Sequence, residues 1–128
     1  MESKSKKSKT LPLKEIEVYQ EAHEIGKEVC KIVSGWNYFH TNTLGKQFLR
    51  AADSISLNIS EGYGRFYYKE NKQFCYYARG SLFESAECLI KAKERKLVDD
   101  NLFQKLSSDL KQLQIRLNNY IASIGTQK

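Results

Sequence analysis

The chain has 128 residues and a single proline, Pro12, so no proline interrupts it after residue 12. Proline breaks helix interiors, and its absence permits long helices. Seven glycines are also too few for the many turns of a β-sandwich or barrel. The length and the 41% of hydrophobic residues are typical of one globular domain. We therefore expect a single all-α domain of long helices joined by few turns.

The N-terminal segment differs in composition from the rest of the chain. Residues 1–14 carry a net charge of +4, out of +6 for the whole chain, from one glutamate, Glu2, and five lysines: Lys4, Lys6, Lys7, Lys9 and Lys14. We therefore divide the chain into a flexible Lys/Ser tail, residues 1–12, and one domain, residues 13–128. Two interpretations of the tail stay open, a solubility tail and an arm that binds nucleic acid.

The cysteines and the apolar runs indicate a cytoplasmic protein. The three cysteines are odd in number and form no C-x-x-C pair, which argues against both a disulfide framework and a zinc finger: Cys30, Cys75 and Cys88. The charged N-terminus lacks the apolar core of a signal peptide. No run approaches the 18 or so apolar residues of a membrane span.

Apolar residues at steps of three and four predict four helices, near residues 13–34, 42–61, 68–96 and 101–124. Gly35 is the expected end of the first helix, and Thr41 or Thr43 the expected cap of the second. The second should end at Gly62 or Gly64, which permit positive φ angles. Asp99-Asp100-Asn101 should cap the fourth, and its two aspartates suit the helix dipole there. Short connections favour an antiparallel up-and-down four-helix bundle.

The third predicted helix is apolar on too many sides for a single bundle. At 100° per residue its non-polar arc spans about 240°, whereas a surface helix needs little over 100°. Only five positions fill the remaining strip: Gln73, Gly80, Glu84, Glu87 and Lys91. We therefore expect another subunit to cover this helix.

The second predicted helix carries a polar row beside its apolar stripe, formed by Gln47, Arg50, Ser54, Asn58 and Glu61. One interpretation is a solvated face. The other is an ordered ladder that meets the third helix through Glu84 or Arg79 and fixes register. Gly80 would then mark a close backbone approach. On the second interpretation, Glu84→Gln should weaken folding or assembly.

These two segments resemble a known family. Residues 47–65, Q-F-L-R-A-A-D-S-I-S-L-N-I-S-E-G-Y-G-R, are followed by F-C-Y-Y-A-R-G-S-L-F-E-S at 74–85. The pattern R-A-A-x-S-I-x-x-N-I-x-E-G-x-x-R, then A-x-G-S-x-x-E, is similar to that of the bacterial 23S rRNA intervening-sequence proteins. Its matching residues include Arg50, Asn58, Glu61, Gly62, Gly80 and Glu84. The resemblance extends over roughly residues 14–123 and excludes the tail.

The resemblance implies an up-and-down bundle that assembles as a ring-like homopentamer. Members of the family are encoded within insertions in large-subunit rRNA genes or stand alone, and they resemble the accessory proteins of diversity-generating retroelements, which work with RNA. The family has no established catalytic residues. We expect its motif residues here to serve packing and register.

The residues offer no catalytic, metal or cofactor site. The two histidines, His23 and His40, lie on different predicted elements and start no H-E-x-x-H or Glu-x-x-His ligand set. Glu84 and Glu87 share a helix face but have no nucleophile or base beside them. Neither G-x-x-x-x-G-K-[ST] nor G-x-G-x-x-G occurs. We therefore expect no enzyme activity, metal or cofactor.

Two non-enzymatic functions remain, RNA binding by a homo-oligomer and a homo-oligomeric protein-interaction scaffold. For RNA, the expected contacts are Lys4, Lys6, Lys7 and Lys9 of the tail, with a second patch of Arg65, Lys69 and Lys72. The cluster G-R-F-Y-Y at 64–68 adds aromatic planes suited to unpaired bases. Its alternative interpretation is a hydrophobic start of the third helix. The RNA and any protein partner are not identified by the sequence.

Overall fold

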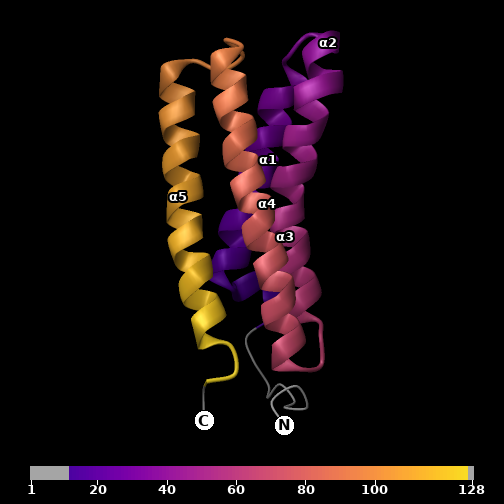
Figure 1. The fold of residues 1–128 in the computed structure, drawn as a ribbon, viewed down its shortest axis with the longest axis vertical. Coiled ribbons are helices and arrows are strands. Elements are labelled where there is room, and N and C mark those ends of the chain that lie inside the picture. The colour runs from indigo at the N-terminus through magenta and orange to yellow at the C-terminus, as the bar shows by residue number, and fades with distance from the viewer. Residues whose placement is uncertain (1–11, 127–128) are drawn as a thin grey trace.

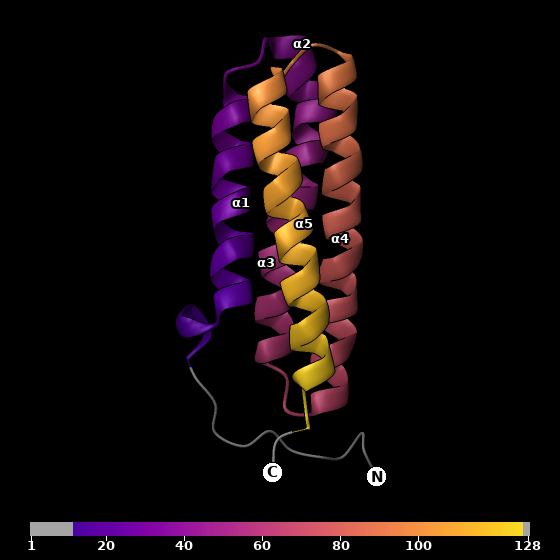
Figure 2. The same cartoon turned by 90° about the vertical axis from the view of Figure 1, so that its left-hand side faces the viewer.

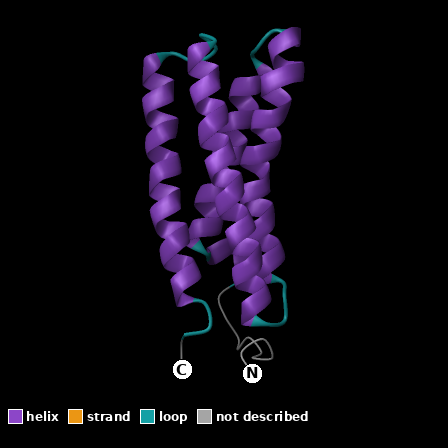
Figure 3. Cartoon of the chain, in the orientation of Figure 1, coloured by secondary structure: helices purple, strands orange, loops and turns teal. Residues whose placement is uncertain are grey.

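The computed structural model describes residues 12–126 and contains four long helices. A short 3₁₀ turn, η2 (Leu13–Glu15), precedes α1 (Glu17–Ser34), and α3 (Lys46–Tyr63), α4 (Tyr68–Glu94) and α5 (Asp100–Ser123) follow. Successive long helices run in opposite directions, as Figure 1 shows. Figure 3 shows no strand in this part of the chain, which confirms the all-α prediction.

The first two predicted helix starts differ from the observed ones. Extended backbone at Ile16 separates η2 from α1, so α1 begins four residues after the predicted start. The second helix begins earlier than predicted, because α2 (Tyr38–His40) and the π-helical turn η3 (Thr41–Gly45) lead into α3 without a break in helical backbone. Its cap is Asn37, whose side chain accepts a hydrogen bond from the His40 amide at 3.0 Å. The prediction of Thr41 or Thr43 as cap was wrong.

The helices pack in the cyclic order α1, α3, α4, α5. The α3–α4 contact is the most extensive and the α1–α5 contact the sparsest of the four. Figure 2 shows α5 in front, between α1 and α4. The largest side chains of the core are fully buried and come from all four helices: Val29, Phe48, Ile55, Ile59, Leu82, Leu89, Leu106, Leu113 and Leu117.

The two ends of the bundle are built differently. One end, here called the tip, consists of residues 35–45 and of the α4–α5 turn, residues 95–99; Figures 1 and 2 place α2 and this turn together. The indole Nε1 of Trp36 donates to the carbonyl of Leu97 at 3.2 Å and ties the two segments to each other. The α3–α4 turn, residues 64–67, lies at the opposite end.

Candidate nucleic-acid interface

The α3–α4 turn is narrow because Gly62 lets α3 approach the start of α4. A Cβ at Gly62 would lie 2.7 Å from Oδ1 and 2.8 Å from the carbonyl oxygen of Asn71, and 3.0 Å from Cβ of Phe74. The positive φ expected at Gly62 or Gly64 is not found, since only Lys96 and Gly125 have positive φ in the described residues. Close packing therefore explains Gly62.

Arg65 lies in this turn and is held by contacts within the subunit. Its guanidinium pairs with Glu61 at 3.0 Å and stacks on the Phe74 ring at 4.7 Å from the centroid. Its Nε is buried without a hydrogen-bond partner. The side chain as a whole nevertheless remains 42% accessible. Arg65 is thus oriented by Glu61 and Phe74 before any ligand arrives.

Lys69 and Lys72 extend the turn along the first turns of α4. Lys69 is exposed and Lys72 half-buried. Within residues 12–126 neither lysine forms an ion pair. Phe66, 53% exposed, precedes them and its ring meets that of Tyr67 edge-on at 4.8 Å. The structure therefore brings Arg65, Lys69 and Lys72 to one end of the bundle beside an exposed aromatic ring.

The predicted tail contacts lie outside the described residues. This holds for Lys4, Lys6, Lys7 and Lys9. Only the last residue of the predicted tail, Pro12, is described, and it precedes η2.

The polar row on α3 bonds mainly to its own helix. The Ser54 hydroxyl donates to the Arg50 carbonyl at 2.8 Å, and the Asn58 amide donates to the Ser54 carbonyl at 2.9 Å. Glu61 pairs with Arg65. No hydrogen bond or ion pair of the described residues joins this row to α4, so a ladder between α3 and α4 is not found within one subunit.

Glu84 and Gly80 of α4 are both exposed. Glu84 forms no hydrogen bond or ion pair with any residue from 12 to 126, so the subunit gives it no role in register. It lines a depression with the α3 row, opposite Thr43, Lys46, Gln47 and Arg50. A Cβ at Gly80 would have no atom within 4 Å. The expected close backbone approach at Gly80 is therefore absent within the subunit.

The tip carries two exposed aromatic side chains that the sequence reasoning did not select. Tyr38 is 83% and Phe39 66% exposed, the highest values among the exposed large hydrophobic residues of residues 12–126. A sequence signal was present, because no Asp or Glu occurs from Val29 to Ala52. A search for helical periodicity did not select Tyr38 and Phe39, because both residues lie in a segment where a loop was expected.

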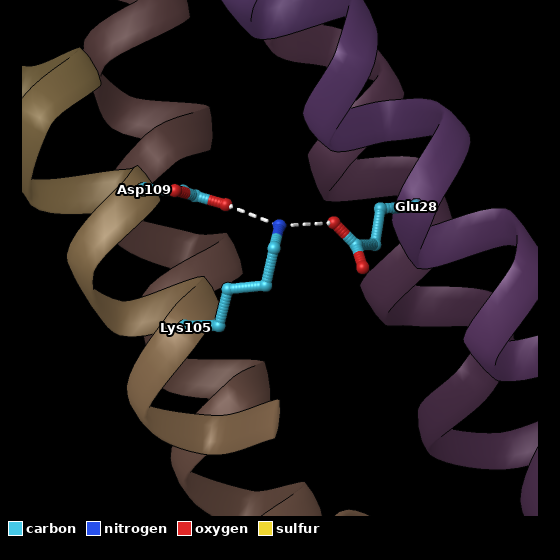
Figure 4. A network of polar contacts seen from close by, with 3 residues as sticks. All are labelled: Glu28, Lys105 and Asp109. Atoms are coloured by element: carbon cyan, nitrogen blue, oxygen red, sulfur yellow. Dashed lines mark hydrogen bonds and ion pairs between the residues drawn. The ribbon is translucent and has the colours of Figure 1, made fainter. Parts of the chain in front are cut away.

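A groove of about 700 Å³ between α1 and α5 has balanced charges. Figure 4 shows Lys105 between Glu28 and Asp109, with N–O distances of 2.7 and 2.8 Å. These two hydrogen bonds raise the pKa of Lys105. Arg116 similarly bridges Glu17 and Glu21 at 2.9 and 3.0 Å. The pKa of Glu21 is raised, because the effect of burial exceeds the opposing effect of the Arg116 charge. Carboxylates hold three of the four cations that line the groove, Lys27, Lys105 and Arg116, so the groove offers little attraction to an anion.

The described residues contain no group of three or more His, Cys, Asp and Glu side chains placed to hold a metal ion. His23 stacks on Tyr19 at 5.8 Å along α1, and His40 lies at the tip against Phe39 at 5.2 Å. None of the helices in the described part of the chain has the length and apolarity needed to cross a membrane.

Comparison with known proteins is consistent with the predicted resemblance. A protein of unknown function from the S23 ribosomal protein family of Bacteroides thetaiotaomicron has a similar structure, with a TM-score of 0.73, 17% sequence identity, and coverage of 81% of this chain and 97% of the other. At this identity the likeness shows the fold alone. No curated protein sequence matches the chain. The sequence model of the 23S rRNA-intervening sequence proteins matches residues 14–119, and the chain therefore belongs to that family.

Proposed function

We propose that the protein is a non-enzymatic homo-oligomer that binds RNA. The observation that carries RNA binding is the group of cations at the α3–α4 turn. Lys69 and Lys72 have no ion pair in residues 12–126, and the oriented guanidinium of Arg65 lies beside them. Phosphate groups attract such cations, and the exposed ring of Phe66 supplies a stacking surface.

Self-association is supported by the outer face of α4. Three large apolar residues recur there at seven-residue intervals, here called the α4 stripe: Tyr76, Phe83 and Ile90, which are 44%, 52% and 45% exposed. Seven-residue spacing is typical of helices that pack along one seam. Gly80 lies between two of them and has open space where a second helix can approach. A second copy of the chain is the proposed occupant, and the family resemblance favours five copies.

Oligomerisation strengthens weak RNA contacts. One tail of four lysines binds weakly, whereas several tails and α3–α4 turns on one assembly raise the effective concentration and multiply affinity about 10²–10⁴-fold. The proposal that the protein is not an enzyme rests on the sequence, which has no nucleophile with a base beside it.

Salt dependence of RNA binding tests this proposal. The logarithm of the affinity for single-stranded RNA should fall with the logarithm of salt concentration, with a slope near −0.7 per phosphate neutralised. Deletion of residues 1–10 should flatten the slope, and Arg65→Ala should weaken binding further. The deletion should leave assembly unchanged, which is its control. Absence of binding at low salt would overturn the proposal.

The α4 stripe also favours the second candidate, a scaffold that holds another protein. Exposed apolar stripes fit protein partners better than they fit polyanions. An oligomer whose retention on RNA is absent at low salt, or unchanged without the tail and Arg65, would favour the scaffold.

A further inference from the structure

The two aromatic side chains at the tip are held outward by a dense set of hydrogen bonds. The carbonyl of Tyr38 accepts from the Asn42 amide at 2.9 Å, and the carbonyl of Phe39 accepts from the Thr43 hydroxyl at 2.8 Å. The Thr41 hydroxyl donates to the carbonyls of Val33 and Trp36 at 3.2 and 3.1 Å. Because the backbone is fixed in this way, Tyr38 and Phe39 are presented to solvent with little backbone left to order on binding.

Gly45 anchors the same turn to the core. A Cβ at Gly45 would lie 2.7 Å from Cγ1 of Val33 and 3.0 Å from the carbonyl oxygen of His40. The π-helical turn η3 therefore packs directly on α1. A π-helical turn is uncommon and is frequently found at functional sites. The tip thus presents exposed aromatic rings on a backbone that is packed closely against α1.

Two cations without an ion-pair partner in the described residues lie about two to three helical turns beyond the aromatic pair. Lys46 and Arg50 are exposed on α3, and neither forms an ion pair within the described residues. Like charges four residues apart on a helix repel each other. An anion bound between them removes this repulsion. Both line the depression of about 390 Å³ whose lining begins at Thr43, which donates its hydroxyl proton to the backbone carbonyl of Phe39.

The charge of this surface favours a polyanion. Carboxylates are absent from Val29 to Ala52, and the lining of the depression has two cations and the single carboxylate of Glu84, a net charge of +1. The Gln47 amide in the lining can donate to phosphate and sugar oxygens, whereas the hydroxyl protons of Thr43 and Ser54 are already donated to the carbonyls of Phe39 and Arg50. By contrast, the cation within the α4 stripe, Arg79, is already engaged, because it donates to Asn118 at 2.9 Å and lies over the Tyr76 ring at 5.0 Å.

We propose that the tip and the adjoining first turns of α3 bind unpaired nucleotides of single-stranded RNA, with bases stacked on Tyr38 and Phe39 of the tip and phosphate held by Lys46 and Arg50 of α3. This site rests on the proposed RNA binding and is distinct from the α3–α4 turn, which lies at the other end of the bundle. Stacking requires exposed base faces, so single strands bind here in preference to duplexes.

Binding of a fluorescent oligouridine of about ten residues, and of an RNA duplex of equal length, tests the site. In the full-length protein, the double variant Tyr38→Ala and Phe39→Ala should lose about fivefold or more of its affinity for the single strand, with little change for the duplex. Lys46→Gln with Arg50→Gln should weaken binding of both and lower the salt slope. Lys111→Gln with Ile115→Ala, a pair of exposed positions on α5, is the matched control and should change neither.

Ultraviolet cross-linking of the same oligouridine provides a second measurement that does not depend on variants. Cross-links mapped by mass spectrometry to residues 36–43 support the tip site. Cross-links confined to the tail and to residues 64–72, with tip variants that bind like the wild type, overturn the tip site and leave the proposed RNA binding intact. Wild-type protein that binds no RNA at low salt overturns both. A tip that captures protein from a lysate while the oligouridine affinity is unchanged by the tip variants also overturns the site.

Discussion

At the scale of single residues, Gly62 is the position with the least room for a side chain between α3 and α4. Two of its three close neighbours belong to Asn71, one of them backbone oxygen, which cannot move without shifting α4. Gly62→Ala should therefore lower the free energy of unfolding by about 1–3 kcal/mol in urea denaturation. Gly64→Ala is the matched control, because its φ is −78° and its nearest neighbours lie 3.6 Å away. Equal stability of the two variants would show that α3 and α4 pack more loosely than described.

Asp53 makes stability depend on pH in an unusual direction for a carboxylate. Burial raises its pKa, and His23 opposes this shift. A folded-state pKa above the unfolded value means that the carboxyl favours folding below the unfolded pKa and loses this contribution as pH rises through the folded pKa. Asp53→Asn should therefore stabilise the protein slightly at pH 7 but not near pH 3, measured by urea denaturation at both. A difference that does not change with pH would contradict this.

At the scale of secondary structure elements, substitutions can test whether Asn37 or Thr43 caps the helical segment that leads into α3. The Asn37 side chain accepts from the His40 amide, whereas the Thr43 hydroxyl only donates back to the Phe39 carbonyl of its own helix. Asn37→Ala should cost about 1 kcal/mol of unfolding free energy. Thr43→Ala should change it by less than about 0.5 kcal/mol, because such back-bonding adds little to helix stability. A larger loss at Thr43 would favour the cap predicted from the sequence.

The sequence pattern predicted the interior of each long helix and the starts of α4 and α5, but not how α1 and α3 begin. The residues of the apolar stripes, such as Phe48, Ile55 and Leu113, are buried as expected, since their spacing alone selects one face. Asp99 accepts from the Leu102 amide at 2.8 Å and was readable as a cap. Asn37 was not, because residues 37–45 have no apolar period and continue as a π-helical turn. The interaction partners of polar residues were the least predictable feature. Arg50 and Glu84 line the same depression but do not pair. Pairing depends on the direction of each side chain, which sequence spacing does not specify.

At the scale of the whole molecule, the outer face of α4 determines whether subunits associate. The four helices bury one side of α4 and leave Phe83 half exposed, so a glutamate at this position is compatible with a folded subunit. In an assembly that buries the α4 stripe, the same glutamate would be an unpaired charge in an apolar contact. Only the exposed half of Phe83 can be newly buried there, so its loss alone removes about 0.8–1.5 kcal/mol at each contact, equivalent to about four- to twelvefold in the dissociation constant.

Light scattering of Phe83→Glu at micromolar concentration measures this effect directly. The wild type should have about five times the 14.8 kDa mass of one chain, and the variant should shift towards monomer with its helical circular dichroism unchanged. Leu57→Glu is the control, because Leu57 is 65% exposed and lies on α3, outside the α4 stripe. A wild type that is monomeric, or a Phe83→Glu variant with the mass of the wild type, would show that the stripe is not the contact between copies. Dissociation by Phe83→Glu with a weaker RNA affinity would also tie binding to assembly, since separate subunits lose the avidity of several tails on one particle.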